Sequence, residues 1–292
     1  MHIERFACCR SLLLHAYYYG TYPARVLRNR SALACGRAPI PVLFYHRIAD
    51  DGANAWTLTN RDFERQMKWL GRHFDIVSFE EVQKRISGHA TPSRRLAVSI
   101  TFDDGHADNC HQAIPFLVKN RIPCTYFVAV EHIVSGEPFA SDGCAPNTVE
   151  QIRAMAEAGI EIGAHTATHA DLGAIRDRQE LRYQLVDSTR QLEDLIQRKV
   201  RYFAFPFGLY TNMTSAAFQM ARDAGFEAVC SAYGGYNYPG DDPFHIQRFH
   251  ADPGMIRLKN RVTIDPRMAG TLRFCPTYDV PANAVSDIEY VC

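Results

Sequence analysis

The alternation of predicted strands and helices is the feature that most constrains the fold of this chain. Short apolar segments typical of strands lie at 39–44, 96–102, 124–130, 161–164, 202–205, 226–230 and 244–249. Segments with the apolar spacing and caps of helices lie between them, at 60–70, 79–87, 109–120, 148–158, 179–197 and 214–224. This order favours an α/β fold with parallel strands and crossover helices, closed or nearly closed into a barrel.

The chain of 292 residues shows no internal repeat, no low-complexity tract and no linker that would divide it. Its length suits one large α/β domain. We therefore predict a main domain over 39–265, an N-terminal extension over 1–38 and a C-terminal tail over 266–292.

Charge and cysteine content exclude some functions. Lys plus Arg and Asp plus Glu both number 32, and a chain without basic excess is a poor candidate for binding a nucleic-acid backbone. The nine cysteines are odd in number and irregularly spaced, which favours a reducing compartment and argues against a zinc–cysteine cluster.

The N-terminal extension contains short apolar runs that Arg10 interrupts, then a tyrosine run at 17–19 and several arginines. It is a weak signal-peptide pattern and is too short to span a bilayer. We expect a helix packed on the domain or a disordered start, and we keep a membrane-surface segment as an alternative. The protein is thus predicted to be cytoplasmic, or peripheral at the inner membrane face.

The predicted strand 96–102 ends in two adjacent carboxylates, Asp103 and Asp104, followed by Gly105. The carboxyl end of a parallel strand is where α/β folds place their chemistry. Neighbouring carboxylates repel each other. A bound cation would reduce this repulsion, as would an arrangement in which one carboxylate binds the cation and the other acts as a base. The alternative is a plain Asp-Asp-Gly turn.

A second polar cluster, His165-Thr166-Ala167-Thr168-His169, directly follows the predicted strand 161–164. Two histidines four residues apart face the same way on a helical turn and suit one metal ion. With a carboxylate from the end of strand 96–102 they predict a two-histidine, one-carboxylate site that leaves positions open for water and substrate.

These two motifs, with Phe205-Pro206-Phe207-Gly208 as a third, resemble the polysaccharide deacetylases (NodB homology domain, carbohydrate esterase family 4) over most of residues 41–250. The resemblance implies a distorted (β/α) barrel. It also implies a hydrolase that uses one divalent metal, usually zinc, to remove N-acetyl groups from sugars.

The resemblance also assigns roles by position. It places the metal on three ligands: Asp104, His165 and His169. It makes Asp103 the general base, and it places the oxyanion and the substrate near Pro206, Phe207 and Gly208, with the N–H of Phe207 as the oxyanion donor.

Three departures from the family pattern leave roles open. Many members carry an arginine where this chain has Ala204, so Arg248 is a candidate either to orient Asp103 or to contact substrate. No clean Leu-x-His supplies the general acid, and His250 is a candidate for it. Ala204 and the start at 44–47 resemble the poly-N-acetylglucosamine deacetylase branch, which makes His46 a second candidate acid or substrate contact, or else a capping histidine.

The implied partner is an N-acetylated oligo- or polysaccharide of a cell-surface or exopolysaccharide. Two alternatives remain: the same fold acting on a small cyclic amide or ureide, and a carbohydrate-binding relative with impaired catalysis. Trp56, Tyr126 and Tyr210 could stack on sugar rings or pack in the core or rim. The sequence predicts no oligomeric state.

Overall fold

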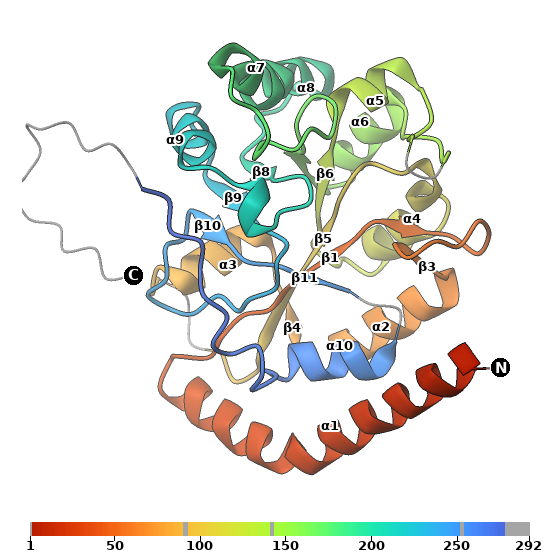
Figure 1. Ribbon diagram of the computed structural model, residues 1–292, viewed down its shortest axis with the longest axis vertical. Helices are drawn as coiled ribbons and strands as arrows, with labels where there is room; N and C mark the ends of the chain where they lie inside the picture. The colour runs from red at the N-terminus through yellow and green to blue at the C-terminus, as the bar shows by residue number, and fades with distance from the viewer. Residues whose placement is uncertain (1, 90–92, 141–142, 252–253, 278–292) are drawn as a thin grey trace, which may run out of the picture.

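A computed structural model describes residues 2–89, 93–140, 143–251 and 254–277. At its centre a mostly parallel sheet curls into a half-barrel, and helices flank it on the outside (Figure 1). The strands are β1 (Val42–Tyr45), β2 (Arg47–Ile48), β3 (Thr57–Leu58), β4 (Asp75–Ile76), β5 (Ala97–Phe102), β6 (Thr125–Val128), β7 (Glu161–Ala164), β8 (Tyr202–Ala204), β9 (Ala228–Cys230), β10 (His245–Ile246) and β11 (Phe249–His250). The predicted α/β barrel is confirmed.

Helices and helical turns connect these strands in the order that the sequence predicts. The helices are α1 (His2–Ala34), α2 (Asn60–His73), α3 (Phe79–Ile86), α4 (Ala113–Lys119), α5 (Val130–Ser135), α6 (Val149–Glu157), α7 (Arg178–Arg182), α8 (Ser188–Ile196), α9 (Ser215–Asp223) and α10 (Met255–Val262). Two short 3₁₀ helices, η1 (Ala107–Cys110) and η3 (Tyr210–Asn212), and one π-helical turn, η2 (Tyr183–Asp187), complete the helical segments.

The order of the main sheet is β10-β9-β8-β7-β6-β5-β1-β11, and every neighbouring pair is parallel. Strand β5 lies between β1 and β6, with Tyr45 opposite Phe102 and Phe102 opposite Tyr126. Because the strands are parallel, their carboxyl ends share one edge of the sheet, and the side chains that follow them meet there.

One strand was predicted over 244–249, and this prediction is wrong. The segment forms two short strands that pair at opposite ends of the sheet, β10 with β9 and β11 with β1. The step between them carries two buried residues: Gln247, which donates to the Tyr236 carbonyl, and Arg248, which donates to the Asp103 carboxylate. Six consecutive residues thus bridge the two edges of the curled sheet.

Several helix boundaries also differ from the prediction. Thr59 caps α2, which starts at Asn60 as predicted but continues past the predicted end at Leu70 to His73. Helices α5 and α10 were not predicted.

Helix α1 settles the form of the N-terminal segment, which packs on the domain. It runs beside α10 across the molecule (Figure 1) and contacts it. The buried Arg25 side chain donates to the Asn260 amide oxygen at 2.8 Å and to the Asn260 carbonyl at 2.9 Å. Within the described residues, no helix is long and apolar enough to cross a bilayer.

Candidate active site

The turn after β5 separates the two adjacent carboxylates. The Asp103 N–H donates to the Tyr45 carbonyl at 2.9 Å, which continues the sheet by one residue. Asp104 and Gly105 then adopt positive φ angles of 73° and 95°. A side chain at Gly105 would place its Cβ 3.2 Å from Ile133, so glycine is favoured by both space and conformation. The carboxylates consequently reach different partners.

Asp103 is held by the buried guanidinium of Arg248. Nη1 donates to Oδ1 at 2.6 Å and Nη2 donates to Oδ2 at 2.8 Å, the two-bond geometry characteristic of strong Arg–carboxylate pairs. Nη1 also donates to the Thr101 hydroxyl at 3.0 Å, and Nε donates to the Ser231 carbonyl at 3.1 Å. Burial alone would raise the pKa of Asp103, but the charge of Arg248 outweighs it and lowers that pKa.

Asp104 faces a different group of residues. Its Oδ1 lies 3.4 Å from His165 Nε2 and 3.3 Å from His169 Nε2, and one ligand atom from each of these three residues lies within 4.8 Å of the others. Oδ1 is buried and has no hydrogen-bond partner among the described residues. A buried carboxylate oxygen without a partner is costly, so this cluster fits a cation placed between its three ligands.

The donor set also fits a divalent metal in its chemistry. His165 Nδ1 lies 2.7 Å from the Ala204 carbonyl, which requires the proton on Nδ1 and leaves the Nε2 lone pair directed at the cluster. Two imidazoles and one carboxylate are ligands that zinc accepts in catalytic sites, with a position left open.

The segment 165–169 is not the helical turn that its spacing predicted. Thr166 and His169 have left-handed φ angles of 68° and 57°, so the two rings converge through a tight irregular turn. Gln184 holds this turn: its Oε1 accepts from the Ala167 N–H at 3.1 Å and from the Thr168 N–H at 3.2 Å. Gln184 lies in the π-helical turn η2, a deviation from regular helix that often accompanies functional sites.

His46 and His250 lie beside the cluster, with Trp56 between them and solvent. His46 Nε2 is 3.9 Å from Asp104 Oδ2, and the rings of His46 and His250 lie 4.6 Å and 4.8 Å from Trp56. Trp56 is 52% exposed, so it forms part of the rim. Burial lowers the pKa of His46 to about 4 despite the two nearby carboxylates, which keeps the free side chain neutral.

The third motif forms a tight bend on the other side of the cluster. Phe207 and Gly208 both have positive φ, and the Phe207 ring is exposed and lies 5.0 Å from His169. Gly208 N–H donates to the Pro206 carbonyl at 2.6 Å, whereas the Phe207 N–H has no partner among the described residues. A Cβ at Gly208 would lie 2.5 Å from the Ala232 nitrogen, so this bend requires glycine.

Residues 90–229 match the family model for polysaccharide deacetylase. Over 219 residues the chain is 27% identical to YxkH of Bacillus subtilis (strain 168), which is named for that family, covering 75% of this chain and 73% of YxkH. This chain carries a polysaccharide deacetylase domain.

Two further relatives are similar. The chain is 29% identical over 147 residues to the chitooligosaccharide deacetylase of Sinorhizobium fredii (strain NBRC 101917 / NGR234), covering 49% of this chain and 58% of that protein. IcaB from Ammonifex degensii has a structure that matches with a TM-score of 0.65 at 26% identity, covering 77% of this chain and 97% of IcaB. The predicted barrel of the polysaccharide deacetylase type is therefore confirmed.

In this polysaccharide deacetylase domain, the residues singled out in the sequence converge at one edge of the sheet. The exceptions are two aromatic candidates. Tyr126 is fully buried with its hydroxyl 3.1 Å from the His106 carbonyl, so it belongs to the core. Tyr210 stacks on Tyr233, at 4.3 Å between ring centroids, and donates its hydroxyl proton to the Leu272 carbonyl.

Two residues of the candidate site carry little signal in the sequence. The only sequence signal that His106 could line the cleft is its place directly after Gly105. His106 is buried, with Nε2 3.7 Å from Asp104 Oδ2. Gln184 carried no signal, because an unbroken helix was predicted around it.

Proposed function

We propose that this protein hydrolyses the N-acetyl groups of an N-acetylated sugar in a surface polysaccharide or exopolysaccharide, and that it needs one divalent metal, zinc, to do so. The observation that supports this most strongly is the separation of two adjacent carboxylates. Asp103 pairs with Arg248, while Asp104 faces His165 and His169. One carboxylate is therefore available as a base and the other as a ligand.

The metal would be held by Asp104, His165 and His169. Bound there, zinc would supply positive charge that polarises the acetyl carbonyl and lowers the pKa of the attacking water. The Ala204 carbonyl fixes the tautomer of His165, and Gln184 fixes the turn that brings His169 back toward Asp104. These contacts preorganise the ligands before any metal arrives.

Asp103 is the proposed general base. It accepts a proton from water as the water oxygen adds to the acetyl carbon. Arg248 keeps this carboxylate ionised and fixes its orientation through two parallel hydrogen bonds. The C–N bond then breaks, acetate leaves, and the sugar nitrogen takes a proton to become the amine.

The N–H of Phe207 is the proposed donor to the oxyanion, because it lacks a partner and lies in the bend beside His169. His250 is the proposed proton donor to the leaving nitrogen, and His46, which its lowered pKa keeps neutral, is the proposed substrate contact. Of the two, His46 lies 3.9 Å from Asp104, and both rings contact Trp56, which offers an exposed face for a sugar ring.

Acetate release from a short N-acetylglucosamine oligomer tests this proposal. We expect the zinc-loaded full chain to release acetate and to produce amine-bearing oligomer by mass spectrometry, and we expect chelator to abolish both. Asp223→Asn is the matched control: Asp223 is exposed on α9, and its substitution should leave the rate unchanged. Acetate release that survives chelator would contradict the proposal.

A parallel assay with a cyclic ureide such as hydantoin separates the alternatives. Ring opening of hydantoin without acetate release from the sugar oligomer would replace the proposed substrate class. Zinc binding and oligomer binding without any turnover would instead show a carbohydrate-binding protein.

A further inference from the structure

Helix α1 attaches to the domain through polar contacts, which is the reverse of the usual arrangement for a surface helix. Tyr17 donates its hydroxyl proton to Asp265 at 2.8 Å, and Arg28 donates to the Ile264 carbonyl at 2.8 Å. Asn29 donates to the Thr263 carbonyl at 3.1 Å. These residues and the buried Arg25 fix the orientation of the helix on α10 and the segment that follows it.

The opposite face of α1 presents apolar side chains to the outside. Leu12, Leu13 and Leu27 are 64%, 70% and 68% exposed, and Tyr19 is exposed as well. Their helical positions place them on the side away from Tyr18 and Arg25, which are buried. Exposed leucines on one face of a helix that is attached by its other face indicate an interaction surface for an apolar partner.

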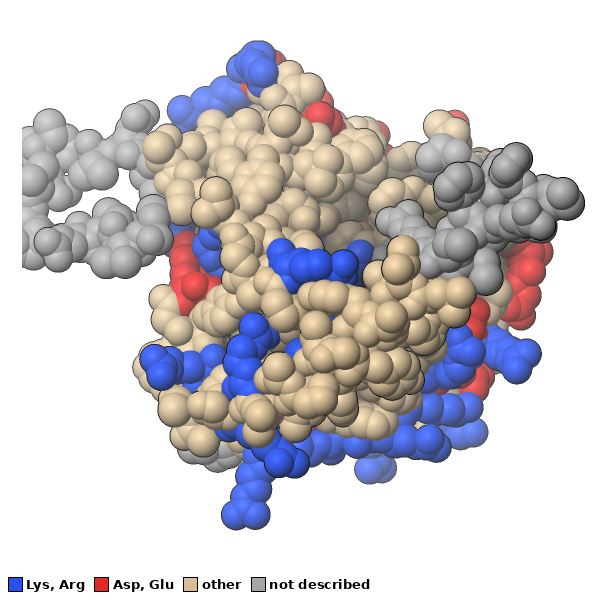
Figure 2. All heavy atoms as spheres, turned by 60° about the horizontal axis from the view of Figure 1, so that its bottom comes forward, with Lys and Arg blue, Asp and Glu red and all other residues tan. Residues whose placement is uncertain are grey.

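The charge around this face has one sign. Residues 5–49 contain seven arginines and no aspartate or glutamate. Arg30 and Arg37 are exposed and form no ion pair within the described part of the chain. Figure 2 brings this side forward and shows Lys and Arg spread across it, with Asp and Glu near its margins. An exposed apolar face bordered by unpaired cations complements an anionic lipid surface.

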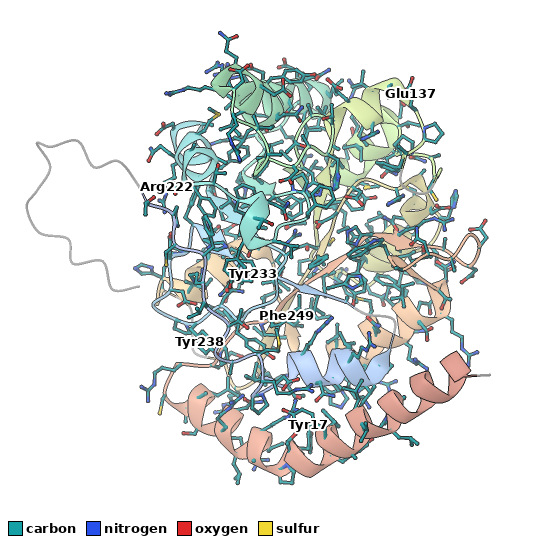
Figure 3. All side chains as sticks on the ribbon, in the orientation of Figure 1. Tyr17, Glu137, Arg222, Tyr233, Tyr238 and Phe249 are labelled. Carbon is teal, nitrogen blue, oxygen red and sulfur yellow. The ribbon has the colours of Figure 1, made fainter. Side chains whose placement is uncertain are left out.

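A groove beside the helix adds to this complementarity. Arg30 of α1 and Arg94 line it, together with the rings of Tyr22 and Trp69. Cationic groups next to aromatic rings suit the phosphate and interfacial regions of a lipid layer. Figure 3 shows Tyr17 on α1 under α10, so the polar attachment and the apolar outer face belong to the same helix.

We propose that the outer face of α1 docks this protein onto an anionic membrane surface, with Leu12, Leu13 and Leu27 entering the interface and Arg30 and Arg37 contacting lipid phosphates. A second copy of the chain fits less well. Twofold pairing of two α1 helices would bring arginines together with no acidic residue between positions 5 and 49 to neutralise them. This inference does not depend on the proposed catalytic activity.

Co-sedimentation with lipid vesicles tests the proposal on the full chain. We expect binding to vesicles that contain phosphatidylglycerol, weaker binding to pure phosphatidylcholine, and loss of binding in high salt. Leu13→Asp with Leu27→Asp should weaken binding about tenfold or more, since each removes an apolar side chain from the interface. Arg30→Glu with Arg37→Glu should weaken binding to anionic vesicles only.

Matched controls use equivalent changes elsewhere. Val134→Asp replaces an exposed apolar residue on α5, and Arg190→Glu reverses an exposed charge on α8; neither should alter sedimentation. Folding of each variant is checked by circular dichroism. Three results would overturn the proposal: no sedimentation with anionic vesicles, binding that the α1 variants leave unchanged, or a solution dimer that Leu27→Asp dissociates.

Discussion

Both terminal nitrogens of Arg248 donate to the two carboxylate oxygens of Asp103, at 2.6 Å and 2.8 Å, and both side chains are buried. The guanidinium reaches Asp103 from the step between β10 and β11. At position 204 the chain has alanine, whose carbonyl instead accepts from His165. The proposed base and the proposed metal ligands are thus positioned by separate sets of contacts.

We predict that Arg248→Lys lowers kcat for deacetylation by about a hundredfold, because an ammonium cannot reproduce two parallel hydrogen bonds. The free energy of unfolding should fall by about 3 kcal/mol, since a buried carboxylate loses part of its pairing. Kinetics and urea unfolding measure the two effects. Arg222→Lys, in an exposed pair with Asp242, is the control and should change each only slightly. Wild-type kcat in Arg248→Lys would show that the pair has no positioning role.

His165→Ala and His169→Ala should each abolish stoichiometric zinc binding, because a site with two remaining ligands holds the metal weakly. Titration calorimetry or elemental analysis of dialysed protein measures this. His111→Ala, at an exposed position, should keep one zinc per chain. Retention of tightly bound zinc in both variants would place the metal elsewhere.

Gln184→Ala should weaken zinc binding by about tenfold to a hundredfold, even though Gln184 does not touch the metal cluster. The reason is that its Oε1 holds the N–H groups of Ala167 and Thr168, which shape the turn between the two histidines. Gln184 Nε2 also donates to Glu180 Oε1 at 2.9 Å, so Gln184→Glu should restore much of the affinity only when it is combined with Glu180→Gln. Gln219→Ala, on the exposed side of α9, serves as the unchanged reference.

Two glycines should respond in opposite ways to alanine. Gly208→Ala should destabilise the protein by about 2 kcal/mol or more, because a Cβ would approach the Ala232 nitrogen to 2.5 Å at a positive φ. Gly71→Ala, inside α2 and exposed, meets nothing within 4 Å and should stabilise by about 0.5–1 kcal/mol. Urea unfolding of the two variants distinguishes these effects, and equal shifts would contradict the local geometry.

Asp265 should make the attachment of α1 depend on pH. Burial raises the pKa of this carboxyl, but hydrogen bonds from Arg267 and Tyr17 outweigh burial and lower it. A lowered folded-state pKa means that the stabilisation is present above the unfolded value, near 4, and is lost as pH falls through the folded value. Unfolding measured from pH 7 to pH 3 should therefore show a smaller loss of stability in Asp265→Asn than in wild type. An identical pH dependence in both would contradict this.

The strand that carries the two carboxylates of the site could be predicted well, because the sequence features that mark it are local. Strand 96–102 is apolar throughout, and the two carboxylates follow it at once, so the position of Asp103 and Asp104 at a sheet edge needed no tertiary information. Helices α3, α6 and α9 likewise begin within one residue of the predicted starts, and the side chains of Ser78, Thr148 and Thr214 cap them.

What the sequence could not reveal depends on distant contacts. Residues 244–249 look like one strand, and only the closure of the barrel divides them and turns Arg248 inward. The left-handed conformations of Thr166 and His169 have no local signature, because neither position holds the glycine that would mark a positive φ in a sequence. Gln184 sits in a π-helical turn that helical periodicity conceals.

The proposed roles of Asp103 as general base and Asp104 as metal ligand are tested most directly with the variants Asp103→Asn and Asp104→Asn. Bound zinc and acetate release are measured on the same preparation of each variant. We predict that Asp103→Asn retains one zinc per chain and releases acetate at least about a hundredfold more slowly, as expected when a general base is removed. We predict that Asp104→Asn loses zinc and activity together. Loss of zinc in Asp103→Asn, or wild-type acetate release by that variant, would contradict the assignment.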